Sequence, residues 1–142
     1  SGLDLSELFY RLIFCFITGN SDMHLKNFSL IETAERSGKY VLSPAYDLLP
    51  VNVIMPEDIE QTALALNGKK QNIRRRDFLV FADECGITRQ SAEKMMRKLL
   101  SMKPQFLAMC GESFLPEDMK RRFAGLIEER CNTLEQGNPT IG

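Results

Sequence analysis

The N-terminal segment, residues 4–18, constrains the fold of this chain more than any other feature of the sequence. Its apolar residues recur at intervals of three and four positions, which predicts an α-helix. From residue 9 to residue 17 apolar side chains cover almost the whole circumference, so we expect this end of the helix to be buried in a core. Gly19 and Asn20 tolerate the left-handed backbone of a helix exit and predict where the helix ends.

A dense polar stretch, residues 19–27, directly follows the buried end of this helix. Polar groups without partners are costly to bury, which indicates a loop with a specific purpose. Residues 28–32 and 40–42 predict the two strands of a small β-hairpin around Gly38. Because Asp47 follows the second strand closely, we expect the hairpin to return Asp47 to the neighbourhood of the polar loop.

The second half of the sequence is mainly helical in its pattern. Residues 62–66 predict a short strand before a turn, and helical periodicity begins near residue 74. Gly86 would end the first of these helices, and Thr88 would cap the next. Pro104 would break or kink that helix, and Pro116 fits the first turn of a last helix that closes near Gly137. The predicted fold is one domain, residues 1–142, mainly α with a small β-hairpin (α+β), and residues 137–142 are expected to form a flexible tail.

Charge, hydropathy and cysteine spacing exclude several classes of protein. The formal net charge of −1 gives no reason to expect direct nucleic-acid binding. The longest apolar run has six residues, far short of a membrane span, so no membrane association is expected. Four widely spaced cysteines and a single histidine do not form a zinc set, and they predict reduced thiols in a cytoplasmic protein.

The polar loop carries the residues with the clearest chemical potential. Asp22, His24 and Asn27 form the pattern Asp-x-His-x-x-Asn, in which the Asp-to-Asn offset equals that of the protein-kinase catalytic loop. In that loop the Asp accepts the proton of the substrate hydroxyl and the Asn holds a magnesium ion. Asp47 could supply a second oxygen ligand to Mg²⁺, and Lys26 could neutralise phosphate. By themselves the three loop residues also fit an ordinary capped loop.

Longer stretches around these residues resemble one particular family. GNSDMHLKNFS (residues 19–29), LSPAYD (42–47) and LALNGK (64–69) are similar to the C-terminal lobe of HipA-like serine/threonine kinases, and the resemblance covers most of the chain. It implies the helical C-lobe of a protein-kinase-like fold, with ATP and Mg²⁺ as cofactors. It also implies a toxin kinase of a toxin–antitoxin system, with a DNA-binding antitoxin as partner and aminoacyl-tRNA synthetases among the possible protein substrates.

The resemblance assigns a role to each residue of the candidate site. Asp22 would be the catalytic base, and Asn27 and Asp47 would bind the metal and, through it, the nucleotide. His24 and Lys26 would be supporting residues of the catalytic loop.

One departure limits what this sequence could do alone. No Gly-rich nucleotide loop, strand lysine or paired Glu helix is present before the catalytic loop, so the nucleotide-covering N-terminal lobe would have to come from elsewhere. We therefore expect the chain by itself to be inactive, as a fragment, as one half of a split kinase or as a remnant. A non-catalytic interaction module remains an alternative function, and so does another atypical kinase, because phosphoinositide kinases share the Asp-x-His-x-x-Asn loop.

Overall fold

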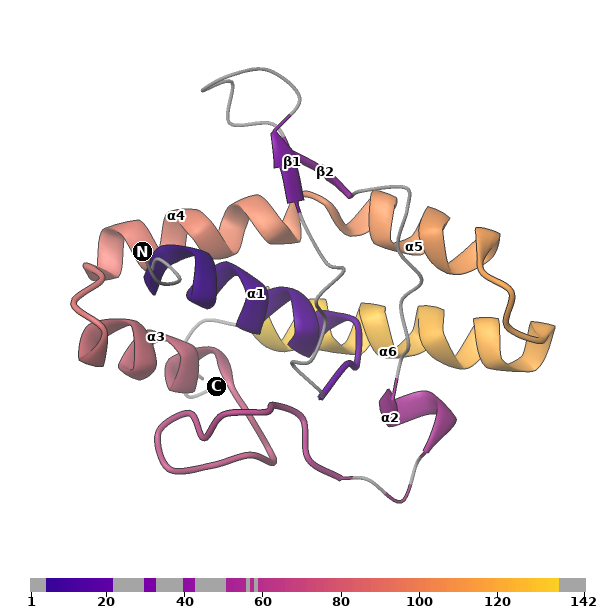
Figure 1. The fold of residues 1–142 in the computed structure, drawn as a ribbon, viewed down its shortest axis with the longest axis horizontal. Helices are drawn as coiled ribbons and strands as arrows, with labels where there is room; N and C mark the ends of the chain where they lie inside the picture. The colour runs from indigo at the N-terminus through magenta and orange to yellow at the C-terminus, as the bar shows by residue number, and fades with distance from the viewer. Residues whose placement is uncertain are drawn as a thin grey trace, which may run out of the picture.

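The computed structural model describes residues 5–21, 30–32, 40–42, 51–55, 57 and 59–135. Within these ranges the fold is mainly helical, as predicted, with five helices of ten or more residues and one short helix (Figure 1). The helices are α1 (Leu5–Ile17), α2 (Val51–Ile54), α3 (Arg75–Glu84), α4 (Arg89–Leu100), α5 (Lys103–Glu112) and α6 (Glu117–Glu135). The strands are β1 (Leu30–Glu32) and β2 (Tyr40–Leu42).

Helix α1 forms the centre of the core. Seven of its residues are buried, and the run from Leu12 to Ile17 is buried without interruption, as its apolar circumference predicts. The helix contacts α4 and α6, and its aromatic rings make edge-to-face contacts with the surrounding helices. Phe16 and Phe9 pack against Phe78 of α3 in this way, and Phe14 packs against Phe106 of α5. Such pairs add to the stabilisation from burial and fix the position of α1 among its neighbours.

The surrounding helices begin and end where local sequence signals place them. Gly86 has a positive φ of 78° beyond the end of α3, and the Thr88 side chain accepts a hydrogen bond from the Ser91 N–H at the start of α4. Helix α4 ends at Leu100, and Pro104 lies in the first turn of α5, where a missing N–H costs nothing. The predicted break at this proline is confirmed.

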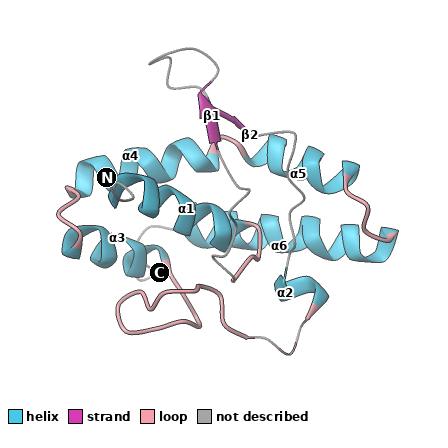
Figure 2. Ribbon diagram, viewed as in Figure 1, coloured by secondary structure: helices cyan, strands magenta, loops and turns pink. Residues whose placement is uncertain are grey.

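The two strands pair antiparallel, with Leu30 opposite Leu42 and Glu32 opposite Tyr40. They lie in the segments for which a hairpin is predicted (Figure 2). The connection between them, residues 33–39, and the segment that leads to Asp47 lie outside the described residues. The hairpin as a unit, and its return of Asp47 to the polar loop, stay predictions. The predicted flexible tail, residues 137–142, also lies outside the described residues.

The prediction of a strand at residues 62–66 is wrong. Leu66 pairs only with Lys69, as an isolated bridge around a tight turn in which Asn67 and Gly68 both have positive φ. The Thr62 hydroxyl donates to the Leu64 carbonyl, 2.7 Å away and only two residues on, so the segment bends where a strand would extend. The residues form part of the long connection between α2 and α3 that is visible in Figure 2.

Two further expectations concern the chain as a whole. All four cysteines are free thiols; three are buried, and Cys85 is half-buried. Among the described helices, none combines the length and the hydropathy that a membrane crossing requires.

Candidate catalytic loop and its support

The five predicted site residues, Asp22, His24, Lys26, Asn27 and Asp47, lie outside the described residues, so their roles stay predictions. The structure does describe the chain immediately before the predicted loop, up to Ser21, and the helix that follows Asp47. These two segments form the described frame on either side of the predicted site residues.

Helix α1 ends in a glycine motif directly before the predicted loop. Gly19 has a φ of 70°, its N–H donates to the Phe16 carbonyl at 3.3 Å, and the Asn20 N–H donates to the Cys15 carbonyl at 2.8 Å. This pair of bonds is a Schellman motif, which satisfies carbonyls that the end of a helix leaves unpaired. The Thr18 hydroxyl also donates to the Phe14 carbonyl, at 2.9 Å. The predicted helix end is confirmed, and the chain leaves the core in one defined direction.

Gly19 also allows a side chain of α6 to approach the backbone closely. A Cβ atom at this position would lie 2.2 Å from Cδ2 of Leu126, a residue of α6. Real Cβ atoms do not approach other atoms this closely, so a larger residue would force Leu126 to move. Helix α6 therefore packs directly against the start of the predicted loop.

Asn52, in α2, joins this loop start to the segment that follows Asp47. Its backbone N–H donates to the Gly19 carbonyl at 3.0 Å, and its side-chain amide donates to the Glu60 carbonyl at 3.0 Å. In sequence, Gly19 lies three positions before Asp22, and Asn52 lies five positions after Asp47. One hydrogen bond thus connects the chain leading into the predicted base to the chain leading away from the predicted metal ligand.

Arg130 connects helix α6 to both of these points. Its side chain is buried, with only 5% of the residue exposed, and Nη1 donates to the Phe16 carbonyl at 2.7 Å. Nη2 donates to Oδ1 of Asn52 at 3.4 Å, and the guanidinium carbon lies 4.7 Å from the centre of the Phe16 ring. The last turn of α1 contains no basic residue of its own. Arg130 supplies the positive charge that favours a helix C-terminus.

The electrostatic environment of Arg130 is unusual for a buried cation. Burial lowers its pKa to about 10, although the charge of Glu129 acts in the opposite direction, so Arg130 remains protonated at neutral pH. Within the described part of the chain, none of the ion pairs involves Arg130, and its Nε–H has no hydrogen-bond partner. Its charge is balanced by carbonyl and amide oxygens and by an aromatic ring.

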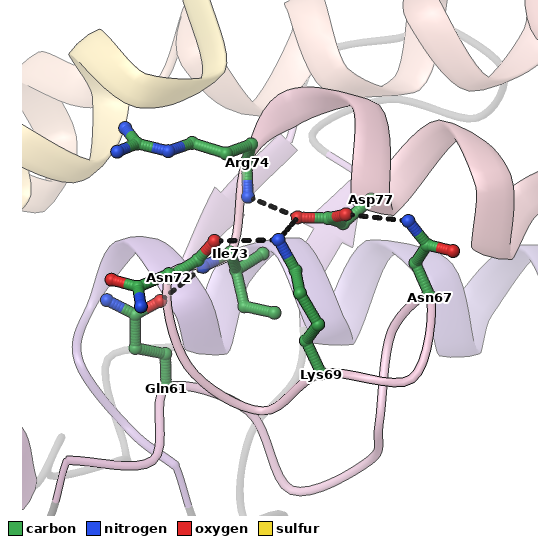
Figure 3. A network of polar contacts seen from close by, with 7 residues as sticks. All are labelled: Gln61, Asn67, Lys69, Asn72, Ile73, Arg74 and Asp77. Atoms are coloured by element: carbon green, nitrogen blue, oxygen red, sulfur yellow. Dashed lines mark hydrogen bonds and ion pairs between the residues drawn. The ribbon is translucent and has the colours of Figure 1, made fainter.

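A second polar cluster holds the connection that leads into α3 (Figure 3). Its centre is Asp77, which is fully buried in the first turn of α3. Lys69 Nζ lies 2.7 Å from Asp77 Oδ2, the Asn67 amide donates to Oδ1 at 3.0 Å, and the Arg74 N–H donates to Oδ2 at 2.7 Å. Burial opposes ionisation of Asp77, but these bonds outweigh it and bring its pKa below the usual 3.8.

Neighbouring bonds complete this cluster. Lys69 Nζ also donates to the Asn72 carbonyl at 3.0 Å, and the Ile73 N–H donates to the Gln61 side chain at 2.9 Å. Both oxygens of the central carboxylate have donors within the cluster. The cluster secures the connection before α3.

The sequence patterns did not assign a role to Arg130 or to Asn52. A signal for Arg130 was present, because it lies on the same stripe of α6 as the buried Phe123, Ile127 and Leu134. A basic residue at a core position of an amphipathic helix indicates a buried polar contact. For Asn52 no comparable signal exists, because its partners depend on three segments meeting in space.

The chemistry of the predicted metal ligands suits magnesium. The amide oxygen of Asn27 and the carboxylate of Asp47 are hard oxygen donors of the kind that Mg²⁺ prefers. In the part of the chain that the structure describes, no group of three or more His, Cys, Asp or Glu side chains could hold a metal ion. Asn27 and Asp47 stay the predicted ligands.

Comparison with known proteins identifies the family. The HipA-like C-terminal domain family matches residues 1–106, which include the predicted loop, Asp47 and the Asp77 cluster. A protein of Haemophilus influenzae named "Putative kinase" is 27% identical over 128 residues, covering 78% of this chain and 36% of that protein. A protein of Sinorhizobium fredii named "Putative kinase Y4dM" is 53% identical over 49 residues, covering 34% of this chain and 12% of that protein. The chain thus spans about a third or less of the length of these relatives, and it belongs to the HipA-like C-terminal domain family.

Proposed function

We propose that this chain is the catalytic-loop lobe of a HipA-like serine/threonine kinase, which transfers the γ-phosphate of ATP to a protein hydroxyl. The observation that carries the proposal is the family match over residues 1–106, because it includes both Asp22-x-His-x-x-Asn27 and Asp47. The names of the two relatives support the same activity.

The proposed roles follow from the chemistry of each side chain. Asp22 orients the acceptor hydroxyl and accepts its proton, while Asn27 and Asp47 hold the cation. When bound, Mg²⁺ neutralises charge on the β- and γ-phosphates. Lys26 adds positive charge beside the phosphates, and His24 supports the loop that carries Asp22.

The described frame suits this role because phosphoryl transfer depends mainly on positioning. The loop starts from a helix end that is buried, closed by a Schellman motif and bonded to α2. A loop that leaves such an anchor begins at a fixed point and in a fixed direction. This reduces the number of orientations that Asp22 can adopt relative to the acceptor.

We also propose that residues 1–142 alone bind ATP weakly and transfer no phosphate. In protein kinases a Gly-rich loop covers the phosphates and a strand lysine pairs with them, and this sequence contains neither. Calorimetric titration with Mg²⁺ and ATP should give weak or undetectable binding. Tight binding would show that the nucleotide site lies elsewhere.

The physiological setting is proposed from family resemblance alone. It suggests a cytoplasmic toxin kinase restrained by a DNA-binding antitoxin, with a protein substrate such as an aminoacyl-tRNA synthetase.

The decisive test of the proposed activity is the substitution Asp22→Asn in the complete native protein. Loss of the positioned base should lower phosphate transfer at least about a hundredfold, whereas ATP binding should persist. Asp83→Asn, which changes an exposed acid on α3, is the matched control and should leave transfer unchanged. Equal transfer by wild type and Asp22→Asn would remove the loop from the mechanism and favour a non-catalytic interaction module.

A further inference from the structure

We propose that Arg130 is a positioning residue for phosphate transfer, because it locks the peptide groups on both sides of Gly19 where the chain enters the predicted catalytic loop. The inference rests on the proposed kinase function. Arg130 lies on α6, beyond the residues 1–106 that the family match covers.

The hydrogen bonds around Gly19 form a closed ring. On one side, the Phe16 carbonyl accepts both the Gly19 N–H at 3.3 Å and Arg130 Nη1 at 2.7 Å. On the other side, the Gly19 carbonyl accepts the Asn52 N–H at 3.0 Å, and Oδ1 of Asn52 accepts Arg130 Nη2 at 3.4 Å. The planar guanidinium thus connects to the N–H of Gly19 through the Phe16 carbonyl and to the carbonyl of Gly19 through Asn52.

This arrangement is a poor device for stability alone. A buried cation loses its hydration, and the neutral oxygens around Arg130 return less energy than a carboxylate would. Replacing a buried ion pair with apolar residues of similar volume is often neutral or stabilising, so a buried charge is weak evidence for stability. An apolar replacement of Arg130 would remove the two hydrogen bonds that connect α6 to α1 and to α2.

Arg130→Met separates packing from positioning. Methionine can fill the space against the Phe16 ring, but it cannot donate to the Phe16 carbonyl or to Asn52. In the complete native protein, with γ-labelled ATP, Mg²⁺ and the protein's own chain as acceptor, we expect kcat to fall about tenfold or more, because small displacements of reacting groups have large effects on rate. The KM for ATP should change by less than about threefold. Arg130→Lys retains the charge but offers one donor nitrogen in place of two, and should give an intermediate kcat.

A control on the same helix tests whether disturbing α6 is sufficient. Glu128→Gln removes the ion pair with Lys103, which has an N–O distance of 2.8 Å, without touching α1 or α2. It should leave kcat unchanged. Hydrogen exchange gives a readout independent of activity: the amides of residues 18–21 should exchange faster in Arg130→Met than in Glu128→Gln, while both variants keep similar melting temperatures.

The outcomes separate this inference from the proposed function. Wild-type activity that is lost in Asp22→Asn but retained in full by Arg130→Met would overturn the positioning role alone, and so would unchanged exchange at residues 18–21. A wild-type protein that transfers no phosphate would overturn both proposals. If Arg130→Met does not fold, Arg130→Lys and Asn52→Ala decide by the same criteria, and wild-type kcat in both would overturn the role.

Discussion

The described part of the molecule buries two charged side chains, Arg130 and Asp77, and it balances their charges in different ways. Asp77 has a cation, an amide and a backbone N–H as donors to its two oxygens. Arg130 has two neutral oxygens and an aromatic ring, and its Nε–H has no partner there. The comparison distinguishes Asp77, which stabilises the connection into α3, from Arg130, which we propose fixes the direction of the chain at the start of the predicted loop.

The different ways in which the two charges are balanced correspond to where Asp77 and Arg130 lie in the fold. Asp77 secures the connection into α3, and every bond in its cluster lies within residues 61–77. Arg130 donates to Asn52 and to Phe16, which lie 78 and 114 positions before it in the sequence, at the point where the predicted catalytic loop begins. We therefore expect changes at Asp77 to reduce stability more than activity, and changes at Arg130 to reduce activity more than stability.

The largest effect on stability should come from Asp77→Ala. The substitution leaves Lys69 without its carboxylate and two N–H donors without an acceptor, so the free energy of unfolding should fall by about 3 kcal/mol. Urea denaturation measures this change, with Asp83→Ala on the exposed side of the same helix as control. At a temperature where the variant is folded, kcat of the complete protein should stay near wild type. A loss of kcat without a loss of stability would reverse the comparison.

A smaller loss of stability is expected for Gly19→Ala, in the region around Arg130. The positive φ and the contact with Leu126 should together lower the free energy of unfolding by about 2 kcal/mol. Leu126→Ala should remove the steric part, so the double variant should lose less than the sum of the two single changes. Strict additivity in this double-mutant cycle would show that the close contact is not what makes glycine necessary.

The smallest expected effect is on the pH dependence of stability, and it distinguishes Asp77 from Arg130 directly. The pKa of Asp77 is lower in the folded state than its ordinary 3.8, so below that value the unfolded chain binds more protons. The stability that Asp77 contributes is therefore complete above about pH 4 to 5 and is lost as the pH falls through the folded pKa. Asp77→Asn should weaken the acid dependence of urea unfolding. Arg130→Met should not, because Arg130 titrates only at alkaline pH. An equal change in both variants would contradict the assignment.

The helical part of the fold could be predicted from the sequence because its signals are local. The apolar circumference of α1, the Thr88 cap and Pro104 in the first turn of α5 each act within a few residues. The predicted strand at residues 62–66 failed because a short apolar run does not reveal whether a partner strand exists. In the structure, the bridge between Leu66 and Lys69 closes a tight turn.

The candidate site also combines features with local sequence signals and features that depend on residues far apart in sequence. Its chemistry was visible in the pattern Asp22-x-His24-x-x-Asn27, because catalytic loops keep a short spacing. Its support was not visible, because the ring through Arg130, Asn52 and Gly19 joins residues that are far apart in sequence. Only the apolar stripe of α6 marked Arg130 as unusual.

The most direct test of the account is a crystal structure of the complete protein with Mg²⁺ and a non-hydrolysable ATP analogue. We predict that side-chain oxygens of Asn27 and Asp47 both bind the cation, at about 2.1 Å. We also predict that the carboxylate of Asp22 faces the acceptor side of the γ-phosphate. A structure in which the cation lies among other ligands, with Asp47 in solvent and far from Asn27, would contradict the assignment of this chain as the catalytic-loop lobe of a kinase.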